Sequence, residues 1–125
     1  MSPPSGEDWF AAGGFGVRRP LRFLAHKLEL SEEQVVKLAR ILAELKTERA
    51  QAAVDNRRRL TELADALAAD QFDAAKVAGV GDKRAETRAR LAAAITAALE
   101  QIHALLTPEQ RGRLAHLIRS GVIAL

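Results

Sequence analysis

Apolar positions recur at steps of three and four residues over two long stretches of this chain. No proline occurs between residues 21 and 107, and over much of this interval leucine, isoleucine and valine return at that spacing. Such spacing places them on one face of an α-helix. The segment Asp70-Gln71-Phe72-Asp73 interrupts the pattern, and its last residue can cap a following helix. The pattern therefore predicts two long helices joined by a turn near residue 70.

Two short motifs mark helix starts. Ser31 is followed three residues later by Gln34, and Thr107 is followed at the same distance by Gln110. In such a capping box the hydroxyl accepts a hydrogen bond from the glutamine amide, and the glutamine side chain returns to the amide of the hydroxyl residue. Gly121 is a typical helix stop. The helices that these signals predict lie over residues 20–29, 32–69, 73–105 and 108–119.

The predicted fold is all-α, a long antiparallel helical hairpin flanked by two short helices. A turn near residue 70 places apolar residues of the two long helices at the same level near the open end, which gives a matched seam there. A hairpin this thin cannot bury both faces, so a second copy is expected to cover it as an intertwined or antiparallel homodimer. The level pairs are Leu42 with Leu99, Leu38 with His103, and Val35 with Leu106.

The middle of the predicted hairpin is more polar than its open end. Gly79 and Gly81 lie inside the second long helix at a cost of about 1 kcal/mol each relative to alanine. They mark either a bend or a close approach of the helices. Here the seam is predicted to pass through Arg49, Asn56, Arg84 and Arg88, supported by Ala52, Ala53 and Leu60.

Composition excludes several classes of protein. The chain has 125 residues, 48% of them hydrophobic, 4% aromatic and none cysteine. Scarce aromatic residues argue against a β-sandwich or barrel, and the absence of cysteine excludes disulfides and thiolate chemistry. No apolar run is long enough to span a membrane. The net charge of +3 is too mild to indicate a nucleic-acid-binding protein.

The first 19 residues are rich in glycine and proline and carry aromatic side chains. We predict that residues 1–19 form a flexible arm and residues 20–125 a single four-helix domain. Trp9 and Phe10 in this arm could fold back on the domain or dock on a partner. The N-terminus lacks a basic segment followed by an apolar one, so no signal peptide is predicted.

The densest charge cluster lies in the middle of the predicted hairpin. The antiparallel register places three consecutive arginines beside basic residues of the second long helix. One interpretation is a patch that attracts acidic segments of a client or partner, or phosphates. The other is a solvated face neutralised by carboxylates four residues away. The basic residues are Arg57, Arg58, Arg59, Lys83, Arg84 and Arg88, and the neutralising pairs are Asp55–Arg59, Arg58–Glu62 and Glu86–Arg90.

Candidate metal ligands and catalytic groups are few. His26, His103 and His116 fall on three different predicted helices that meet at the open end, where they are weak candidates for a metal site. The alternative, which we favour, is that they are partly buried or interfacial imidazoles. No nucleophile has a neighbouring base and no pair of carboxylates lines a cleft. We therefore expect no enzyme, no cofactor and no metal.

The two capping boxes and their context resemble a known family. Leu30-Ser31-Glu32-Glu33-Gln34 and Leu106-Thr107-Pro108-Glu109-Gln110 resemble the paired Leu-Thr-x-x-Gln motifs of the Spy/CpxP family, with a helical hairpin between them. The resemblance implies an all-α, cradle-shaped dimer in the bacterial envelope. Members act as ATP-independent chaperones, as stress-signalling inhibitors or as metal-resistance proteins. The motif residues transfer as structural caps: Ser31, Gln34, Thr107 and Gln110.

Three functional hypotheses follow. The first is a homodimeric, ATP-independent chaperone or stress-response protein that binds unfolded or partner proteins through the hairpin surface, periplasmic by resemblance. The second is a heavy-metal-responsive sensor with the same fold. The third is a cytoplasmic interaction module that docks on a signalling or assembly protein through its arm. The candidate client- or partner-binding residues are Arg57, Arg58, Arg59, Arg84, Arg88, Trp9 and Phe10.

Overall fold

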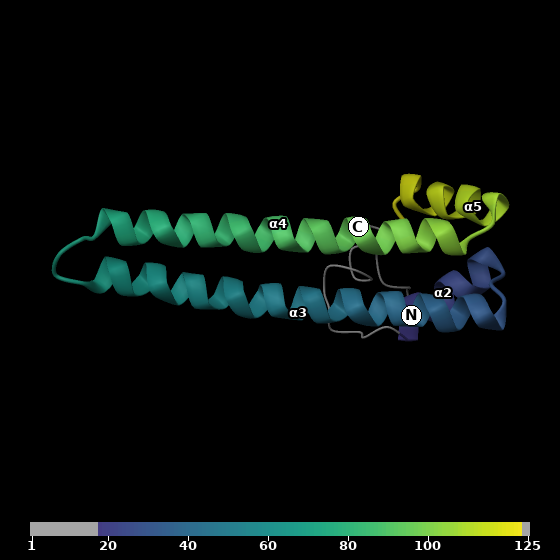
Figure 1. The fold of residues 1–125 in the computed structure, drawn as a ribbon, viewed down its shortest axis with the longest axis horizontal. Helices are drawn as coiled ribbons and strands as arrows, with labels where there is room; N and C mark the ends of the chain where they lie inside the picture. The colour runs from purple at the N-terminus through teal and green to yellow at the C-terminus, as the bar shows by residue number, and fades with distance from the viewer. Residues whose placement is uncertain (1–17, 124–125) are drawn as a thin grey trace. The chain divides into compact units, whose positions relative to one another are not determined.

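A computed structural model describes residues 18–123 of the chain, and these residues form four helices and no strand (Figure 1). The predicted all-α fold is therefore confirmed, with each helix end within two residues of its predicted position. The predictions for Trp9, Phe10 and the rest of the arm up to residue 17 lie outside the described residues. The helices are α2 (Arg18–Leu28), α3 (Glu32–Ala68), α4 (Ala74–Leu105) and α5 (Pro108–Arg119).

The junction of α2 and α3 combines a left-handed helix stop with a capping box. Glu29 has φ +52°, and the amide of Leu30 reaches back to the carbonyl of Ala25 at 3.0 Å. This is the Schellman arrangement, here without the usual glycine. The amide of Ser31 then donates to Gln34 Oε1 at 2.9 Å, and the Gln34 amide donates to Ser31 Oγ at 3.2 Å. The predicted first capping box is present.

The turn between α3 and α4 lies where the sequence pattern places it. α3 ends at Ala68 and α4 begins at Ala74. The amide of Lys76 donates to Asp73 Oδ1 at 3.1 Å, so Asp73 caps α4. The predicted cap and turn are both confirmed.

The second capping box starts α5. Thr107 accepts from the Gln110 amide at 3.2 Å, and Gln110 Oε1 accepts from the Thr107 amide at 3.0 Å. Pro108 takes the first helical position, where no amide hydrogen is needed. At the other end Gly121 adopts φ +81° and its amide donates to the carbonyl of Ile118 at 3.1 Å, which ends the helix as predicted.

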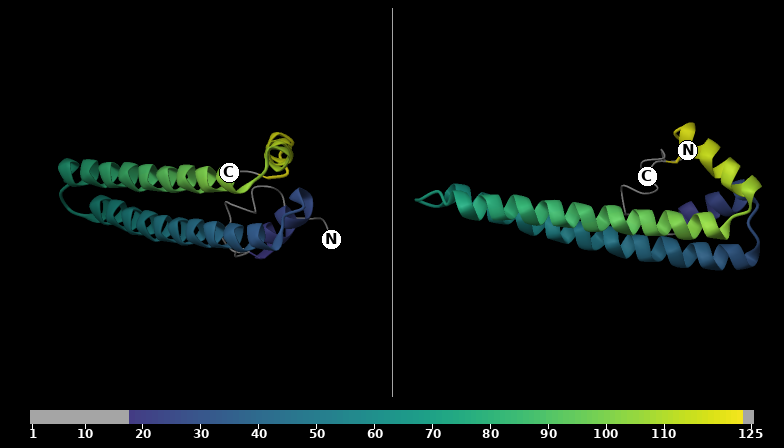
Figure 2. Two further views of the ribbon diagram at one scale, coloured as in Figure 1. Left: turned by 45° about the vertical axis from the view of Figure 1, so that its right-hand side comes forward. Right: turned by 45° about the horizontal axis from the view of Figure 1, so that its top comes forward.

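The chain divides into two compact units. Unit 1 comprises residues 1–46 and 97–125, and unit 2 comprises residues 47–96. In unit 1, α2 and α5 lie beside the start of α3 and the end of α4 (Figure 2). Their packing excludes water from a leucine-rich interior, where Leu28 and Leu38 are each 1% exposed. The buried members of this cluster are Leu24, Leu28, Leu38, Leu42, Leu106 and Ile123.

The C-terminal segment contributes to this interior. From the sequence, the apolar residues after Gly121 could fold back on the domain or, in a dimer, cover the partner chain. Ile123 is 3% exposed within its own unit, and its amide donates to the carbonyl of Leu117 at 3.3 Å, so this residue folds back. The left-handed turn at Gly121 reverses the chain so that Ile123 reaches the cluster.

The seam of unit 2 differs from the predicted one. Its buried positions on α3 are Ala52, Asp55 and Ala66, whereas Asn56 is exposed and Leu60 is 59% exposed. The difference arises because Asp55 forms an ion pair with Arg90 of α4, and this pair turns the aspartate toward the seam. Of the other residues predicted for the seam, Arg49 is half-buried, whereas Ala53, Arg84 and Arg88 are exposed. On α4 the buried residues are instead Val80 and Thr87.

The two glycines of α4 do not mark a close approach between helices. α4 runs without interruption through Gly79 and Gly81. Apart from the adjacent residues and backbone of α4 itself, a Cβ atom added at either position would meet no atom within 4 Å. The close-approach alternative is therefore wrong.

Candidate functional site

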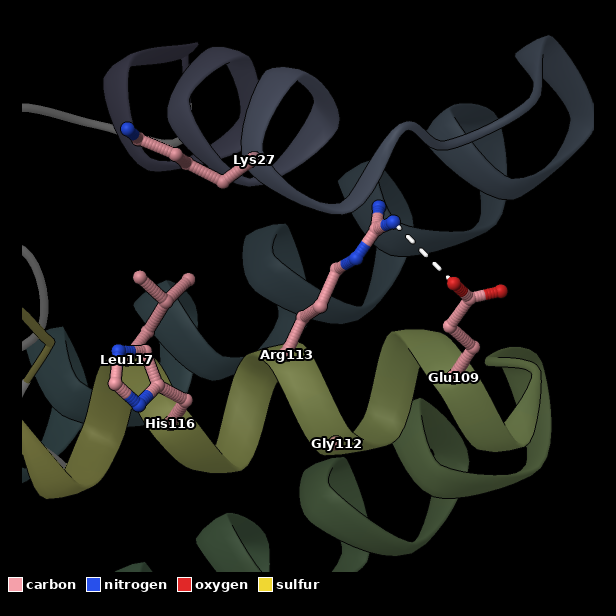
Figure 3. Close-up of a pocket in the computed structure, with 6 residues that line it drawn as sticks. All are labelled: Lys27, Glu109, Gly112, Arg113, His116 and Leu117. Carbon is pink, nitrogen blue, oxygen red and sulfur yellow. Dashed lines mark hydrogen bonds and ion pairs between the residues drawn. The ribbon is translucent and has the colours of Figure 1, made fainter.

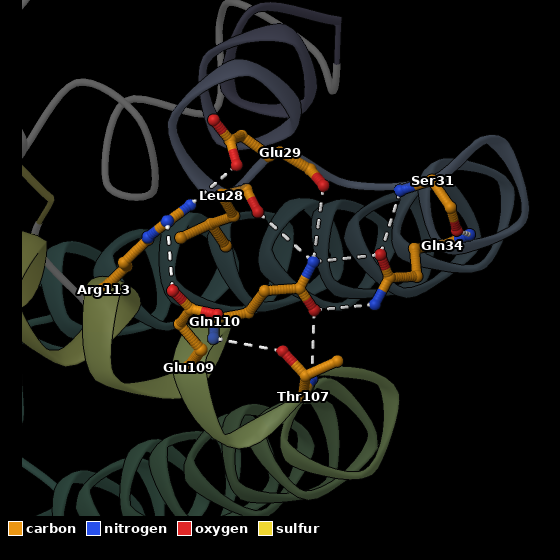
Figure 4. A network of polar contacts seen from close by, with 8 residues as sticks. All are labelled: Leu28, Glu29, Ser31, Gln34, Thr107, Glu109, Gln110 and Arg113. Carbon is orange, nitrogen blue, oxygen red and sulfur yellow. Dashed lines mark hydrogen bonds and ion pairs between the residues drawn. The ribbon is translucent and has the colours of Figure 1, made fainter.

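The two motif glutamines form a reciprocal pair inside unit 1 (Figure 4). Gln34 Nε2 donates to Gln110 Oε1 at 2.8 Å, and Gln110 Nε2 donates to Gln34 Oε1 at 3.1 Å. Each glutamine also completes its own capping box, so both helix starts are bonded to each other. We call these two residues with Ser31 and Thr107 the glutamine clasp.

The clasp also holds the backbone around it. Gln110 Nε2 points toward the carbonyls of Leu28 at 3.2 Å and Glu29 at 3.5 Å, at the end of α2. Gln34 Nε2 donates to the carbonyl of Leu105 at 3.1 Å, at the end of α4. Carbonyls at the C-terminal end of a helix have no hydrogen-bond donor within the helix. The side-chain amides of the clasp donate hydrogen bonds to these carbonyls. Its chemistry is thus structural: it joins all four helix ends that meet here.

Sequence reasoning predicts each half of the clasp but not the pair. Capping boxes are local and can be recognised from four residues. The register, however, places Val35 level with Leu106, and the Gln34–Leu105 contact lies one residue from that pair. The predicted register and the two motifs, taken together, would have indicated that the two glutamines meet.

A pair of surface carboxylates flanks the clasp. Arg113 Nη1 lies 3.2 Å from Glu29 Oε2, and its Nη2 lies 3.4 Å from Glu109 Oε1. Both glutamate side chains are largely exposed and that of Arg113 is 41% exposed, so each pair contributes at most about 1 kcal/mol. They orient the guanidinium rather than stabilise the fold.

The arginines of unit 2 are not equivalent. Arg57 and Arg58 are exposed, whereas the side chain of Arg59 is 14% exposed and its Nη1 lies 2.7 Å from Glu62 Oε1. Arg84 and Arg88 of α4 are exposed. The structure thus leaves four of the five predicted arginines at the surface and turns one into the seam.

One ion pair across the seam shows which arginines of α3 and α4 lie side by side. Arg90 Nη2 lies 2.5 Å from Asp55 Oδ2 across the seam. Because α3 and α4 run antiparallel, Arg57 and Arg88 each lie two residues further toward the turn and so share a level. Of the neutralising pairs expected at four-residue spacing, Asp55 pairs with Arg90 instead of Arg59, and Glu62 pairs with Arg59 instead of Arg58.

Two seam residues of unit 2 have shifted pKa values. Gln51 Nε2 donates to Asp55 Oδ1 at 3.1 Å, and this bond, with the hydrogen bond and the charge of Arg90, holds the pKa of Asp55 below its ordinary value against the opposing effect of burial. Burial lowers the pKa of Arg49, whose Nε has no hydrogen-bond partner. The seam of unit 2 is therefore polar at its centre.

The three histidines lie on the helices predicted for them. His26 on α2, His103 on α4 and His116 on α5 are all exposed rather than partly buried. Among residues 18–123, no three histidine or carboxylate side chains gather in a way that could hold a metal ion. The metal-responsive hypothesis stays a prediction.

Surface grooves indent unit 1, and two of them are lined by residues within 18–123. The first has a volume of 590 Å³ and lies between α2 and α5 (Figure 3). There Lys27 projects from α2 with its Nζ 5.9 Å from the centre of the Phe23 ring. The second, of 360 Å³, lies between α3 and α4. The lining residues of the first are Lys27, Glu109, Gly112, Arg113, His116 and Leu117.

Comparisons with known proteins identify a family. The chain matches the family described as LTXXQ motif family protein over residues 17–117. Searches of curated proteins and of solved structures each returned no significant match. In the described part of the chain, no helix combines the length and hydrophobicity needed to cross a bilayer. Because the match covers α2, α3, α4, most of α5 and both capping boxes, the chain belongs to the LTXXQ motif family, which includes the Spy/CpxP-type proteins.

Proposed function

We propose that the chain is an ATP-independent chaperone or stress-response protein of Spy/CpxP type. It binds unfolded or partner proteins through the surface of unit 2. The observation that carries the proposal is the mixture of exposed apolar and cationic side chains on this unit. Leu60 is 59% exposed, Leu67 78% and Phe72 61%, and they share the unit with Arg57 and Arg58.

Such a surface suits weak binding to unfolded chains. Exposed leucine and phenylalanine side chains gain free energy when they bury apolar segments of a client. Exposed arginines attract acidic segments and stay solvated while doing so. Neither interaction requires a shaped pocket, so clients of unrelated sequence can bind. The proposal assigns no catalytic step to the chain.

Compartment and self-association follow the family. Members of the LTXXQ family are typically periplasmic. We propose the periplasm as the working compartment and a homodimer as the working form. A dimer would present two copies of unit 2 to one client.

An aggregation assay tests the proposal. A reduced or heated client is followed by light scattering with and without the full chain, in the absence of nucleotide. We expect suppression at stoichiometric ratios. The double variant Leu60→Ser/Leu67→Ser and the double variant Arg57→Gln/Arg58→Gln should each weaken it several-fold.

Matched controls change equally exposed residues of unit 1. Val36 is 61% exposed and Lys46 is exposed, and both belong to α3. Val36→Ser and Lys46→Gln should leave suppression unchanged. Absence of suppression by the wild-type chain would contradict the proposal. Equal losses in the control and test variants would contradict the assignment to unit 2.

A further inference from the structure

The groove between α3 and α4 in unit 1 has an apolar floor and a basic rim. Ile41, which is 6% exposed, and the half-buried Leu105 form the floor, and Lys37 and Arg40 are exposed. A floor of this kind favours an apolar side chain, because contact with it removes more hydrocarbon surface from water. The complete lining is Lys37, Arg40, Ile41, Gln101, Ala104 and Leu105.

Both charged residues that line this groove are cationic. Lys37 Nζ lies 3.1 Å from Glu33 Oε1, but both side chains are more than half exposed, so water competes with this pair. Arg40 makes no ion pair within residues 18–123. The groove therefore favours a segment that combines carboxylates with large apolar side chains.

We propose that the occupant is the segment Glu7-Asp8-Trp9-Phe10 of the same chain. Its two carboxylates complement Lys37 and Arg40, and its two aromatic rings provide large apolar surfaces for the floor. Acidic and aromatic residues adjoin in this segment, as the rim and floor adjoin in the groove. The inference goes beyond the proposed function and does not rest on it, because this groove belongs to unit 1.

The chain that connects the segment to α2 is longer than a helix is wide. Eight peptide steps separate Phe10 from Arg18, the first residue of α2, which belongs to the same unit as the groove. Eight extended residues span up to about 26 Å. A helix with its side chains is about 10–12 Å across. The proposal requires a path from Arg18 to the groove that is no longer than this span.

Trp9 is the single tryptophan of the sequence and reports on the docking directly. In the full chain, its fluorescence emission should lie at shorter wavelength than that of a synthetic peptide of residues 1–17. Acrylamide should also quench it less. The double variant Lys37→Glu/Arg40→Glu should shift the emission to longer wavelength and increase the quenching.

Two further variants separate docking from folding. Lys46→Glu/Arg119→Glu makes the same change in charge at exposed residues of unit 1 outside the groove and should leave the emission unchanged. Adding Glu7→Lys/Asp8→Lys to the groove variant restores opposite charges and should restore the short-wavelength emission. Far-UV circular dichroism checks that each variant keeps its helix content.

Three outcomes would overturn the proposal. In the first, wild-type emission equals that of the free peptide. In the second, Lys37→Glu/Arg40→Glu leaves emission and quenching unchanged. In the third, the emission moves with protein concentration, which would assign the groove to the arm of a second copy. None of these measurements uses a client, so they are independent of the aggregation assay.

Discussion

Gln34 and Gln110 exchange two hydrogen bonds through their side-chain amides, at 2.8 and 3.1 Å, although 76 residues separate them. An amide side chain has both donor and acceptor groups, so this pairing uses both ends of each residue. Since each glutamine also caps a helix, the pair couples two local structures that the sequence encodes separately. The family motif thus acts as one unit in space.

A double-mutant cycle tests this coupling. Gln110→Ala should lower the free energy of unfolding by about 3 kcal/mol, because it removes several hydrogen bonds and strands buried carbonyls. Gln34→Ala should lower it by about 2 kcal/mol. The double variant should lose about 1 kcal/mol less than the two losses combined. Urea unfolding followed by circular dichroism measures all three, with the exposed Gln101→Ala as control. Strict additivity would show that the glutamines act independently.

Replacing the glycines of α4 should stabilise the chain. Gly79→Ala and Gly81→Ala should each raise the free energy of unfolding by about 1 kcal/mol, because alanine is the better helix former and its Cβ meets nothing. The same substitution at Gly121 should have the opposite effect on stability. Its φ of +81° strains any Cβ, so this variant should lose about 1 kcal/mol. A loss of stability at Gly79 or Gly81 would contradict the open surroundings found there.

The left-handed conformation of Glu29 carries a cost that glycine would remove. With φ +52°, Glu29→Gly should be more stable than Glu29→Ala by about 1 kcal/mol. Both variants lose the surface pair with Arg113, so the comparison isolates the backbone. Thermal unfolding of the two proteins provides the measurement. Equal midpoints would show that the position carries no strain.

The hydrogen bond from Gln51 and the ion pair with Arg90 lower the pKa of Asp55, so the stability of the chain should depend on pH. Its pKa in the folded chain lies below the ordinary value of 3.8, so the unfolded chain binds the proton more readily. The stabilisation is complete above pH 3.8 and disappears as the pH falls through the lower folded pKa. Asp55→Asn should therefore be less stable than the wild type near neutral pH, with the difference shrinking in acid.

Urea titrations at several pH values measure this difference. Asp65→Asn, at an exposed aspartate of the same helix, is the control and should show little change. A difference between wild type and Asp55→Asn that stays constant into acid would rule out a charged role for Asp55.

Sequence patterns located the helices because their boundaries are encoded locally. Ser31, Asp73, Thr107 and Gly121 each fix one helix end through bonds within about four residues. The leucine seam of unit 1 could also be predicted from the sequence, because large apolar residues at helical spacing are usually buried.

The polar seam of unit 2 could not be located in this way. Asn56 continues the apolar spacing, yet Asp55 is buried because Arg90 of α4 lies across from it. A polar residue is buried only if a partner satisfies it, and that partner comes from another helix. The side of the helix that faces inward was therefore decided by an ion pair and not by hydrophobic spacing. For the same reason, local patterns place Leu60 in the seam, where the structure exposes it.

The interior of unit 1 is built of leucine, whereas that of unit 2 contains alanine, threonine and an ion pair. This difference affects how cooperatively the chain unfolds. Small and charged side chains bury less hydrocarbon, so residues 47–96 are held by less free energy than the cluster around Leu28 and Leu38. Amide hydrogens in that central stretch should exchange with deuterated water by partial openings. Those near the leucines should exchange only when the whole chain melts. The proposed client surface is thus carried by the part of the molecule that opens most readily.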